Sequence, residues 1–237
     1  MLIDTAPAPI NGVIFDFHGT LVAGGDAEGW IDAALRSLGG TTQLDSAHRA
    51  GLREHLDHIW HHAHTIDPRS ERDLSHDRHR DVFARTVALH PGAGPELIAA
   101  LYAVMPDQWA PFADTVPVLR ELRARGVRTV VLSNIGLDIR PHLDRIGVGE
   151  LIDGVVLSYE AGLVKPDPAI YARALELLGV PAVETLMVGD SPRDDVGGVP
   201  LGVRTLILPR TEGPVHGLAA VLQMTGRPAL SAGQGRF

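Results

Sequence analysis

The chain has 237 residues, a formal net charge of −8 and no cysteine, which excludes disulfides, thiolate metal sites and cysteine nucleophiles. Its length suits one large domain, or a core domain with a smaller domain inserted. The sequence has no basic stripe, so we expect no nucleic-acid partner. No apolar run approaches the ~20 residues of a membrane helix, and the N-terminus lacks the basic region of a secretory signal. We therefore expect a cytoplasmic protein.

The first predicted element is a short strand at residues 13–15. Its apolar residues are continuous rather than alternating, which is typical of a central strand in a parallel sheet. The run ends on an acid, Asp16, and a turn-like Gly-Thr pair follows at 19 and 20, with His18 between them. A carboxylate at the end of a buried strand, close to an imidazole, is a first candidate for a functional group.

Residues 24–110 change character and show helical patterns. Apolar residues recur at three- and four-residue spacing, and Asp, Ser or Gly-Pro stands near each start. The predicted helices cover residues 26–39, 46–66, 70–89 and 94–105. We interpret this region as an inserted helical domain of four helices, with residues 1–23 and 111–237 forming the core domain around it.

From residue 111 onward, strands alternate with helices. Strands are predicted at 127–134, 152–158, 184–190 and 203–209, and helices at 116–126, 139–148, 167–180 and 214–224. This alternation predicts an α/β fold with a parallel sheet and right-handed crossovers. Residues 226–237 are small, polar and uncapped, and we expect a flexible tail there.

Polar residues stand at or just after four of the predicted strand ends. Because ligands bind outside the carboxyl ends of the strands in an open parallel sheet, we expect these residues to share one crevice. Taken singly, each is compatible with a helix cap, a turn or a solvated loop charge. Their common position favours a single site. The residues are Asp16, Ser133 with Asn134, Lys165, and Asp190 with Asp194 and Asp195.

These side chains fit the binding of a phosphoryl group. The carboxylates of Asp16 and Asp190 are hard oxygen ligands of the kind that Mg²⁺ takes. The metal and Lys165, the single lysine of the chain, would neutralise a dianion, and the Ser133 hydroxyl would donate to its oxygens. A carboxylate at the centre of such a site can attack phosphorus and form an aspartyl phosphate.

Four segments, "DFHGTLV", "LSN", "KPDPAIY" and "GDSPRDDV", resemble the four motifs of the haloacid dehalogenase-like (HAD) hydrolase superfamily. They occur in the family's order across residues 11–210, and the branch with a helical cap between the first two motifs is the most similar. The resemblance implies a Rossmann-like core with a helical C1 cap over the site. It also implies a small phosphorylated molecule as the substrate and Mg²⁺ as the cofactor.

The resemblance assigns roles to individual residues of the first and third motifs. Asp16 would be the nucleophile, and the backbone carbonyl of His18 would be a metal ligand. Thr20 would position the loop beside the nucleophile and belong to the phosphate-binding set. Lys165 would bridge the nucleophile and the phosphoryl group.

The second and fourth motifs supply the remaining expected ligands. Ser133 would hydrogen-bond the phosphoryl group, with Asn134 beside it in the phosphate-binding set. Asp190 would ligate Mg²⁺, with Asp195 holding the ion directly or through water. Asp194 occupies a position that is often Asn in the family.

The first motif departs from the family's phosphatases at residue 18. Those enzymes resemble "DxDGT", and their second Asp is a general acid and base, so His18 becomes the candidate for that role, with an unperturbed pKa of about 6.5. The family's metal-independent 2-haloacid dehalogenases have Tyr there. Three functions remain: an Mg²⁺-dependent phosphatase, a 2-haloacid dehalogenase, or a phosphate-binding protein with impaired turnover. The acids of "GDSPRDD" favour the first.

Nine of the twelve histidines lie between residues 48 and 90. His58 and His62 stand four residues apart, a spacing that can bind a transition metal. We interpret the cluster as the solvated face of a helix, with metal binding and contact with an anionic substrate in the crevice as the alternatives. The three tryptophans, Trp30, Trp60 and Trp109, are expected to be packing residues.

Overall fold

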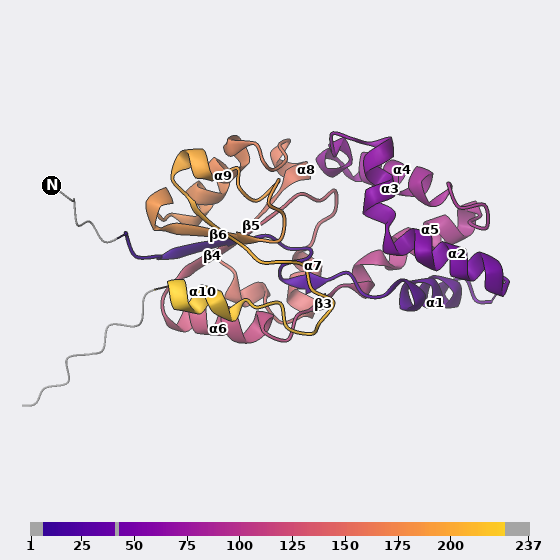
Figure 1. The fold of residues 1–237 in the computed structure, drawn as a ribbon, viewed down its shortest axis with the longest axis horizontal. Helices are drawn as coiled ribbons and strands as arrows, with labels where there is room; N and C mark the ends of the chain where they lie inside the picture. The colour runs from indigo at the N-terminus through magenta and orange to yellow at the C-terminus, as the bar shows by residue number, and fades with distance from the viewer. Residues whose placement is uncertain (1–6, 41–42, 226–237) are drawn as a thin grey trace, which may run out of the picture.

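The computed structural model describes residues 7–40 and 43–225; the predicted tail at 226–237 lies outside them. Figure 1 shows two parts, a core built on a sheet and a region of helices beside it. In the described part of the chain, no helix is both long and apolar enough to cross a membrane.

The core contains a five-stranded parallel sheet, as the sequence predicts. Its central strand, β1, is fully buried, and the neighbouring strands pair Phe15 with Val131 on one side and Val188 on the other. This register brings the carboxyl ends of the three middle strands to one edge. In spatial order the strands are β5 (Gly154–Leu157), β4 (Arg128–Ser133), β1 (Gly12–Phe15), β6 (Thr185–Gly189) and β7 (Arg204–Ile207).

Helices cover both faces of this sheet (Figure 1). Because strand side chains alternate between faces, Ile14 packs in a cluster with residues of α9, while Val13 and Phe15 pack in the larger cluster that includes residues of α6, α7 and α10. The core helices are α6 (Thr115–Ala124), α7 (Arg140–Arg145), α8 (Ser158–Ala161), α9 (Pro168–Leu178) and α10 (Ala219–Met224). Short 3-10 helices are η3 (Gly149–Leu151), η4 (Ala182–Glu184) and η5 (Val199–Leu201).

The last core helix is shorter than predicted. The pattern indicates a helix from residue 214, but α10 begins at Ala219. The carboxylate of Asp114 accepts the backbone N–H groups of His216, Gly217 and Leu218 at 3.1, 2.8 and 2.7 Å. Gly217 also has φ +98°, a conformation that lies outside a right-handed helix. A distant carboxylate therefore holds this segment in a turn.

The inserted region is helical, but two predicted helices are each divided. In place of residues 46–66, one helix ends and another begins around His58, whose φ of −115° and ψ of 17° interrupt the helix. In place of 70–89, a 3-10 turn precedes a helix whose N-cap is Ser75, which accepts from the N–H of Arg78. The elements are α1 (Ala27–Ser37), α2 (Ser46–Asp57), α3 (Ile59–Ile66), η1 (Glu71–Leu74), α4 (His76–Val87), α5 (Pro95–Val104) and η2 (Met105–Gln108).

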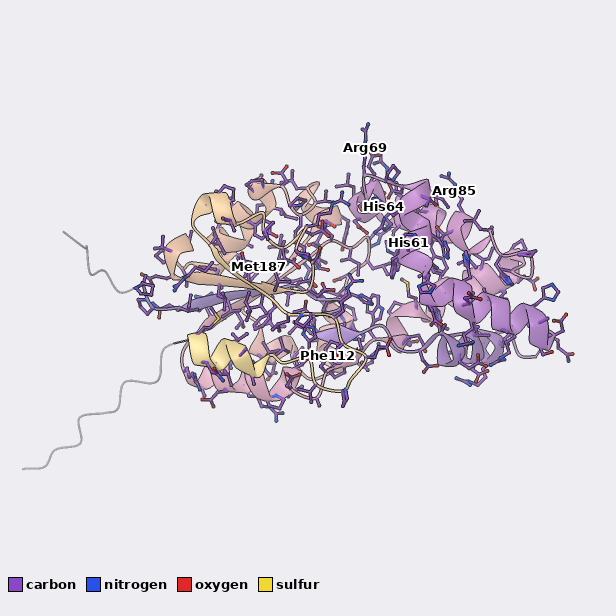
Figure 2. All side chains as sticks on the ribbon, viewed as in Figure 1. His61, His64, Arg69, Arg85, Phe112 and Met187 are labelled. Carbon is purple, nitrogen blue, oxygen red and sulfur yellow. The ribbon has the colours of Figure 1, made fainter. Side chains whose placement is uncertain are left out.

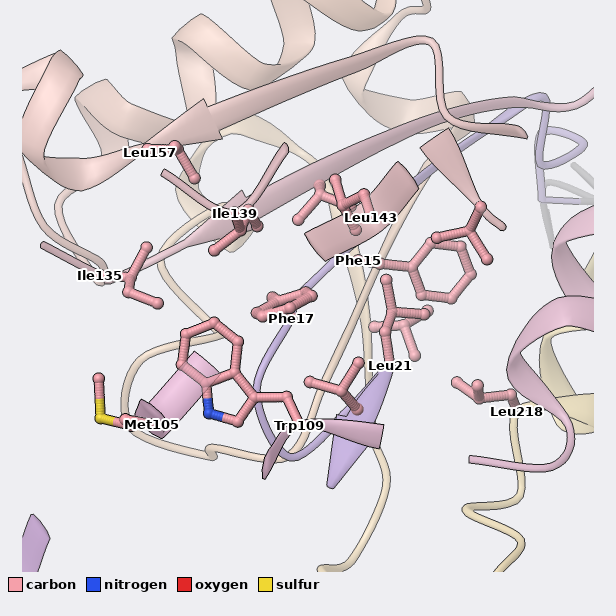
Figure 3. Close-up of a cluster of buried hydrophobic side chains, with 14 of the residues drawn as sticks. Phe15, Phe17, Leu21, Met105, Trp109, Ile135, Ile139, Leu143, Leu157 and Leu218 are labelled. Carbon is pink, nitrogen blue, oxygen red and sulfur yellow. The ribbon is translucent and has the colours of Figure 1, made fainter. Parts of the chain in front are cut away.

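A two-stranded antiparallel ribbon joins the two parts. It pairs β2 (Val22–Ala23) with β3 (Ala110–Pro111), and the predicted domain boundaries fall at this ribbon. The indole of Trp109 lies edge-on to Phe17, with ring centroids 5.6 Å apart, inside the cluster of Figure 3. Trp30 is likewise buried and donates to the carbonyl of Leu101 at 2.8 Å. Both are packing residues, as expected.

Candidate active site

A crevice of about 770 Å³ lies at the carboxyl ends of the strands and is lined by both the core and the helical region. From here on, the helical region between β2 and β3 is called the cap. The structure brings the predicted site residues together: all except Thr20 line the crevice, and Thr20 is buried next to Asp16. Those lining it are Asp16, His18, Ser133, Asn134, Lys165, Asp190, Asp194 and Asp195.

Asp16 is held by hydrogen bonds to both carboxylate oxygens. Its backbone N–H donates to the carbonyl of Val188 at 2.9 Å, which continues the ladder between β1 and β6 by one residue. The hydroxyl of Thr20 donates to Oδ2 at 3.0 Å, and Nζ of Lys165 donates to Oδ1 at 2.7 Å. The carboxylate therefore has a fixed orientation at the end of the central strand.

Lys165 is buried between two carboxylates. Its Nζ lies 2.7 Å from Oδ1 of Asp16 and 2.6 Å from Oδ1 of Asp195. Burial by itself lowers the pKa of Lys165, but the two carboxylates outweigh that effect and raise the pKa above its ordinary range. Burial has the opposite effect on an acid and raises the pKa of Asp195, and the ammonium of Lys165 opposes that rise. Lys165 is therefore a permanent positive charge in the site.

Asn134, expected in the phosphate-binding set, is hydrogen-bonded to the backbone of Lys165. Its Nδ2 donates to the carbonyl of Lys165 at 3.0 Å, and its Oδ1 accepts the backbone N–H of Lys165 at 2.7 Å. The amide group is thus engaged with the loop that carries the lysine. Ser133, by contrast, is buried at the end of β4, and within the described residues its hydroxyl makes no hydrogen bond, so it is free to donate to a ligand.

Three buried carboxylates converge beside the nucleophile. Oxygens of Asp16, Asp190 and Asp195 lie within 4.8 Å of one another. A Cβ at Gly19, which has φ +89°, would lie 2.8 Å from Oδ2 of Asp190, and a Cβ at Gly189 would lie 2.0 Å from Oδ2 of Asp195. Glycine at these positions makes room for the acids. An all-oxygen set of buried carboxylates fits a hard divalent cation such as Mg²⁺.

His18 lies where the first motif meets the ribbon. Its ring is partly buried and edge-on to Trp109, with centroids 6.0 Å apart. A Cβ at Gly24 would lie 3.2 Å from its Nε2, so the ring packs closely against the start of the cap connection. Burial lowers the pKa of His18 below 6.5, and the carboxylates of Asp16 and Asp190 partly oppose this shift.

Arg210 is a lining residue that the motifs do not include. It follows β7, and its Nε donates to Oδ2 of Asp190 at 2.5 Å from a side chain that is largely exposed. Arg210 directly follows the predicted strand 203–209. The rule that polar groups at strand ends form the site therefore extends to Arg210. Ser191 was missed as well; its hydroxyl donates to Oδ2 of Asp194 at 2.9 Å.

The cap contributes a second wall, formed by Trp60, Arg72, Asp73 and His79 together with neighbouring residues. This wall rests on the core. The hydroxyl of Ser158 donates to the carbonyl of Asp73 at 2.5 Å. A Cβ at Gly136 would lie 2.5 Å from Cβ of His79, so η1 and the start of α4 pack directly on the loop that follows β4. No sequence motif marks these four residues, because their proximity depends on the fold of the cap.

Most of the cap histidines lie away from the crevice. Figure 2 places His61 and His64 on the cap, and both are exposed. The rings of His55 and His62 stack with centroids 4.5 Å apart. Across residues 7–40 and 43–225, Asp16, Asp190 and Asp195 form the only group of three or more His, Asp or Glu side chains close enough together to hold a metal. His79 is the cap histidine that lines the crevice.

Comparison with known proteins finds similarity both to phosphatases and to dehalogenases. A glyceraldehyde 3-phosphate phosphatase from Methanopyrus kandleri is 32% identical over 133 residues, which is 54% of this chain and 56% of that protein. The chain spans 56% to 65% of the length of the first three curated relatives that it matches. An L-2-haloacid dehalogenase structure is 26% identical with a TM-score of 0.63, covering 91% of this chain and 98% of that one.

A further solved structure and a family model complete the comparison. A HAD family enzyme from Bacteroides thetaiotaomicron, solved with magnesium and inorganic phosphate, has a TM-score of 0.56 at 19% identity, covering 86% of this chain and 96% of that one. The family model described as a haloacid dehalogenase-like hydrolase matches residues 10–199, which include all four motifs. The sequence-based prediction is confirmed, and the chain belongs to the haloacid dehalogenase-like hydrolases.

Proposed function

We propose that the protein is a Mg²⁺-dependent phosphatase that hydrolyses small phosphate esters through an aspartyl-phosphate intermediate. The observation that carries this proposal is the arrangement around Asp16, whose carboxylate is oriented by Lys165 and Thr20 beside two further buried acids. The relative named as a glyceraldehyde 3-phosphate phosphatase supports it, as does the family enzyme solved with magnesium and phosphate.

In the first step, a carboxylate oxygen of Asp16 forms a bond to phosphorus while the bond from phosphorus to the ester oxygen breaks. The leaving oxygen takes a proton from the protonated form of His18, which is the minor form at neutral pH because burial lowers the pKa of His18. The hydroxyl of Ser133 donates to a phosphoryl oxygen, and Lys165 offsets negative charge as it gathers on the transferring group.

In the second step, water attacks phosphorus and the bond between phosphorus and Asp16 breaks, which releases inorganic phosphate and restores the carboxylate. His18, having lost its proton in the first step, accepts one from the attacking water. Asp16, Asp190 and Asp195 would hold Mg²⁺, whose positive charge would stabilise the phosphoryl oxygens. The backbone carbonyl of His18 stays a predicted fourth contact.

Dehalogenation is the second candidate, and the 26% identical dehalogenase structure favours it. In that reaction Asp16 would attack carbon and expel a halide, with no need for a metal. The cluster of Asp16, Asp190 and Asp195 argues against it, because the two cations that contact these three carboxylates within the described residues leave a negative charge in excess, which a metal ion would offset.

The test is a panel of phosphate esters and a 2-haloacid, each with Mg²⁺ and with EDTA. We expect phosphate release that requires Mg²⁺ and that falls by at least about 10⁴-fold in Asp16→Asn. Halide release that persists in EDTA would establish the dehalogenase. Calorimetric binding of a phosphate ester with no product from any substrate would identify instead a phosphate-binding protein with impaired turnover. Turnover of esters by Asp16→Asn at the parent rate would refute the mechanism.

A further inference from the structure

The cap wall carries a guanidinium that is poorly satisfied. The side chain of Arg72 is 14% exposed and lines the crevice. Its Nη1 is buried and has no hydrogen-bond partner, and within the described residues its guanidinium makes no hydrogen bond at all. A group with five N–H donors that is largely removed from water without partners is costly, so a partner in the crevice is the simplest account.

The acids near Arg72 do not satisfy it. Its Nη1 lies 3.6 Å from Oδ2 of Asp67, and its Nε lies 3.7 Å from Oδ1 of Asp73, both longer than hydrogen bonds. The oxygens of Asp67 already accept the backbone N–H groups of Glu71 and Arg72, at 3.0 and 2.8 Å. Burial raises the pKa of Asp73 to about 7, so this acid is only partly ionised at neutral pH.

The guanidinium is nevertheless held in place. Its Cζ lies 5.4 Å from the ring centroid of Trp60, a cation–π contact that helps to hold it. Nδ1 of His79 is 2.9 Å from the hydroxyl of Tyr102, and burial lowers the pKa of His79 to about 4, so this neighbour stays neutral. A positioned guanidinium with free donors is suited to bidentate recognition of a planar anion.

Arg72 lines the crevice from the cap, whereas the groups that would hold the phosphoryl group belong to the core. The phosphoryl end of the crevice is defined by Asp16 and Lys165 in the core. The two walls are close, because residues of both line one crevice and the hydroxyl of Ser158 in the core donates to the carbonyl of Asp73 in the cap. A substrate held by its phosphoryl group in the core therefore extends its remaining atoms toward the cap wall.

We infer that Arg72 binds a carboxylate on the leaving group, so that the substrates are small phosphate esters that also carry a carboxylate. This inference rests on the proposed function. A carboxylate fits better than a second phosphate because the cap residues that line the crevice include one guanidinium beside the acids Asp26, Asp57 and Asp73. The single guanidinium can pair with one carboxylate, whereas the second charge of a phosphate dianion would find no other cation among the described residues of this wall and would be repelled by those acids.

The test uses two matched pairs of esters that differ only in a carboxylate against a hydroxymethyl group: 3-phosphoglycerate with glycerol 3-phosphate, and phosphoglycolate with 2-hydroxyethyl phosphate. We expect kcat/KM to favour the carboxylate member of at least one pair by about 10- to 100-fold, the range of a charge-assisted hydrogen bond. Arg72→Gln should remove most of this ratio, chiefly through KM. Arg72→Lys, which keeps the charge but not the fork, should retain part of it.

The matched control is Arg78→Gln, on the exposed face of the same segment, which should leave the ratio as in the parent protein. No preference in either pair, or an equal loss on both members in Arg72→Gln, would overturn the inference while leaving the proposed function intact. If neither the pairs nor p-nitrophenyl phosphate is hydrolysed, the proposed function has failed. Calorimetric titration of Asp16→Asn with each pair then decides the inference, since equal affinities overturn it. If Arg72→Gln does not fold, the ratio of kcat/KM values that the parent protein shows within each pair decides the inference.

Discussion

The two walls of the crevice differ in how their charged groups are paired. On the core side, the ammonium of Lys165 bridges the carboxylates of Asp16 and Asp195 at hydrogen-bond distance. On the cap side, Arg72 approaches its two acids no closer than 3.6 Å. Both arginine and lysine are mostly buried, so solvent does not account for the difference.

The difference follows from the elements that carry these groups. Asp16 stands at the end of β1, whose hydrogen-bond register fixes its position, and Asp195 is held in the turn after β6, where its Oδ2 accepts the N–H of Ser191 at 2.9 Å. Arg72 lies in a single 3-10 turn of the cap, where no strand register fixes its position. The core wall is therefore organised before a substrate arrives, as the transfer of any phosphoryl group requires, while the cap wall keeps donors free for a group that varies between substrates.

The largest expected effect comes from removing the ammonium of the core wall. Lys165→Met would leave two buried carboxylates facing each other, which should lower the free energy of unfolding by about 3–5 kcal/mol and abolish turnover. Urea unfolding of both proteins measures the first effect. Arg80→Met, which breaks an exposed ion pair on the cap, should change stability little. Equal stabilities for Lys165→Met and the parent would show that the core wall is not organised by this charge.

The second expected effect separates proton transfer from phosphoryl binding on the core wall. His18→Ala should reduce kcat on alkyl phosphate esters by about 10²–10⁴-fold, because their leaving oxygens need a proton. The loss on p-nitrophenyl phosphate should be much smaller, since its leaving group departs as an anion. Steady-state kinetics on both substrates give the two ratios, and His18→Asp should recover alkyl-ester turnover. A uniform loss on both substrates would mean that His18 acts on binding instead.

The third expected effect is a pH dependence that arises on the cap wall. Burial raises the pKa of Asp73 in the folded state to about 7, and the charges of Asp67 and Asp194 add to the rise while Arg72 and Lys165 oppose it. The unfolded chain titrates near 3.8. Between these values the folded state binds the proton more tightly, so this group stabilises the protein at low pH and the contribution is lost as pH rises toward 7.

Asp73→Asn mimics the protonated form and should remove that loss. Relative to the parent, the variant should be more stable at pH 8, by about 4 kcal/mol at most, with the difference vanishing near pH 4. Unfolding free energies from urea titrations at several pH values check this. The exposed Asp77→Asn on α4 serves as the control and should show no such trend. A difference between Asp73→Asn and the parent that does not change with pH would contradict the assignment.

The core wall could be predicted from the sequence because its chemistry coincides with local signals. Asp16 and Asp190 each follow an apolar strand, and parallel pairing places such ends together whatever the details of packing. The same rule extended by one residue would have reached Arg210. What the strand pattern did not reveal is that Asn134 holds the Lys165 loop, since that contact joins residues 31 positions apart.

The cap wall could not be predicted, because it depends on breaks in the helical pattern. The periodicity favours continuous helices over 46–66 and 70–89. Trp60 would then lie in the first helix and Arg72 in the second. In the structure Ser70 adopts φ +54°, and Arg72 lies in a 3-10 turn against Trp60. Residue spacing does not encode a left-handed serine, which occurs only where surrounding contacts hold it.

The smallest expected effect concerns the contact between the two walls. The hydroxyl of Ser158 donates to the carbonyl of Asp73 in the cap and accepts the N–H of Ile135, at 2.8 Å, from the loop after β4. Ser158→Ala would leave a buried N–H and a carbonyl without these partners, at a cost of about 1–3 kcal/mol. Because this hydroxyl joins cap to core, the substitution should also speed hydrogen exchange at Ile135. Ser37→Ala, which removes a hydroxyl bonded only within the cap, should leave that exchange unchanged. If both variants exchange alike at Ile135, this hydrogen bond does not hold the cap on the core, and the free donors of Arg72 owe nothing to it.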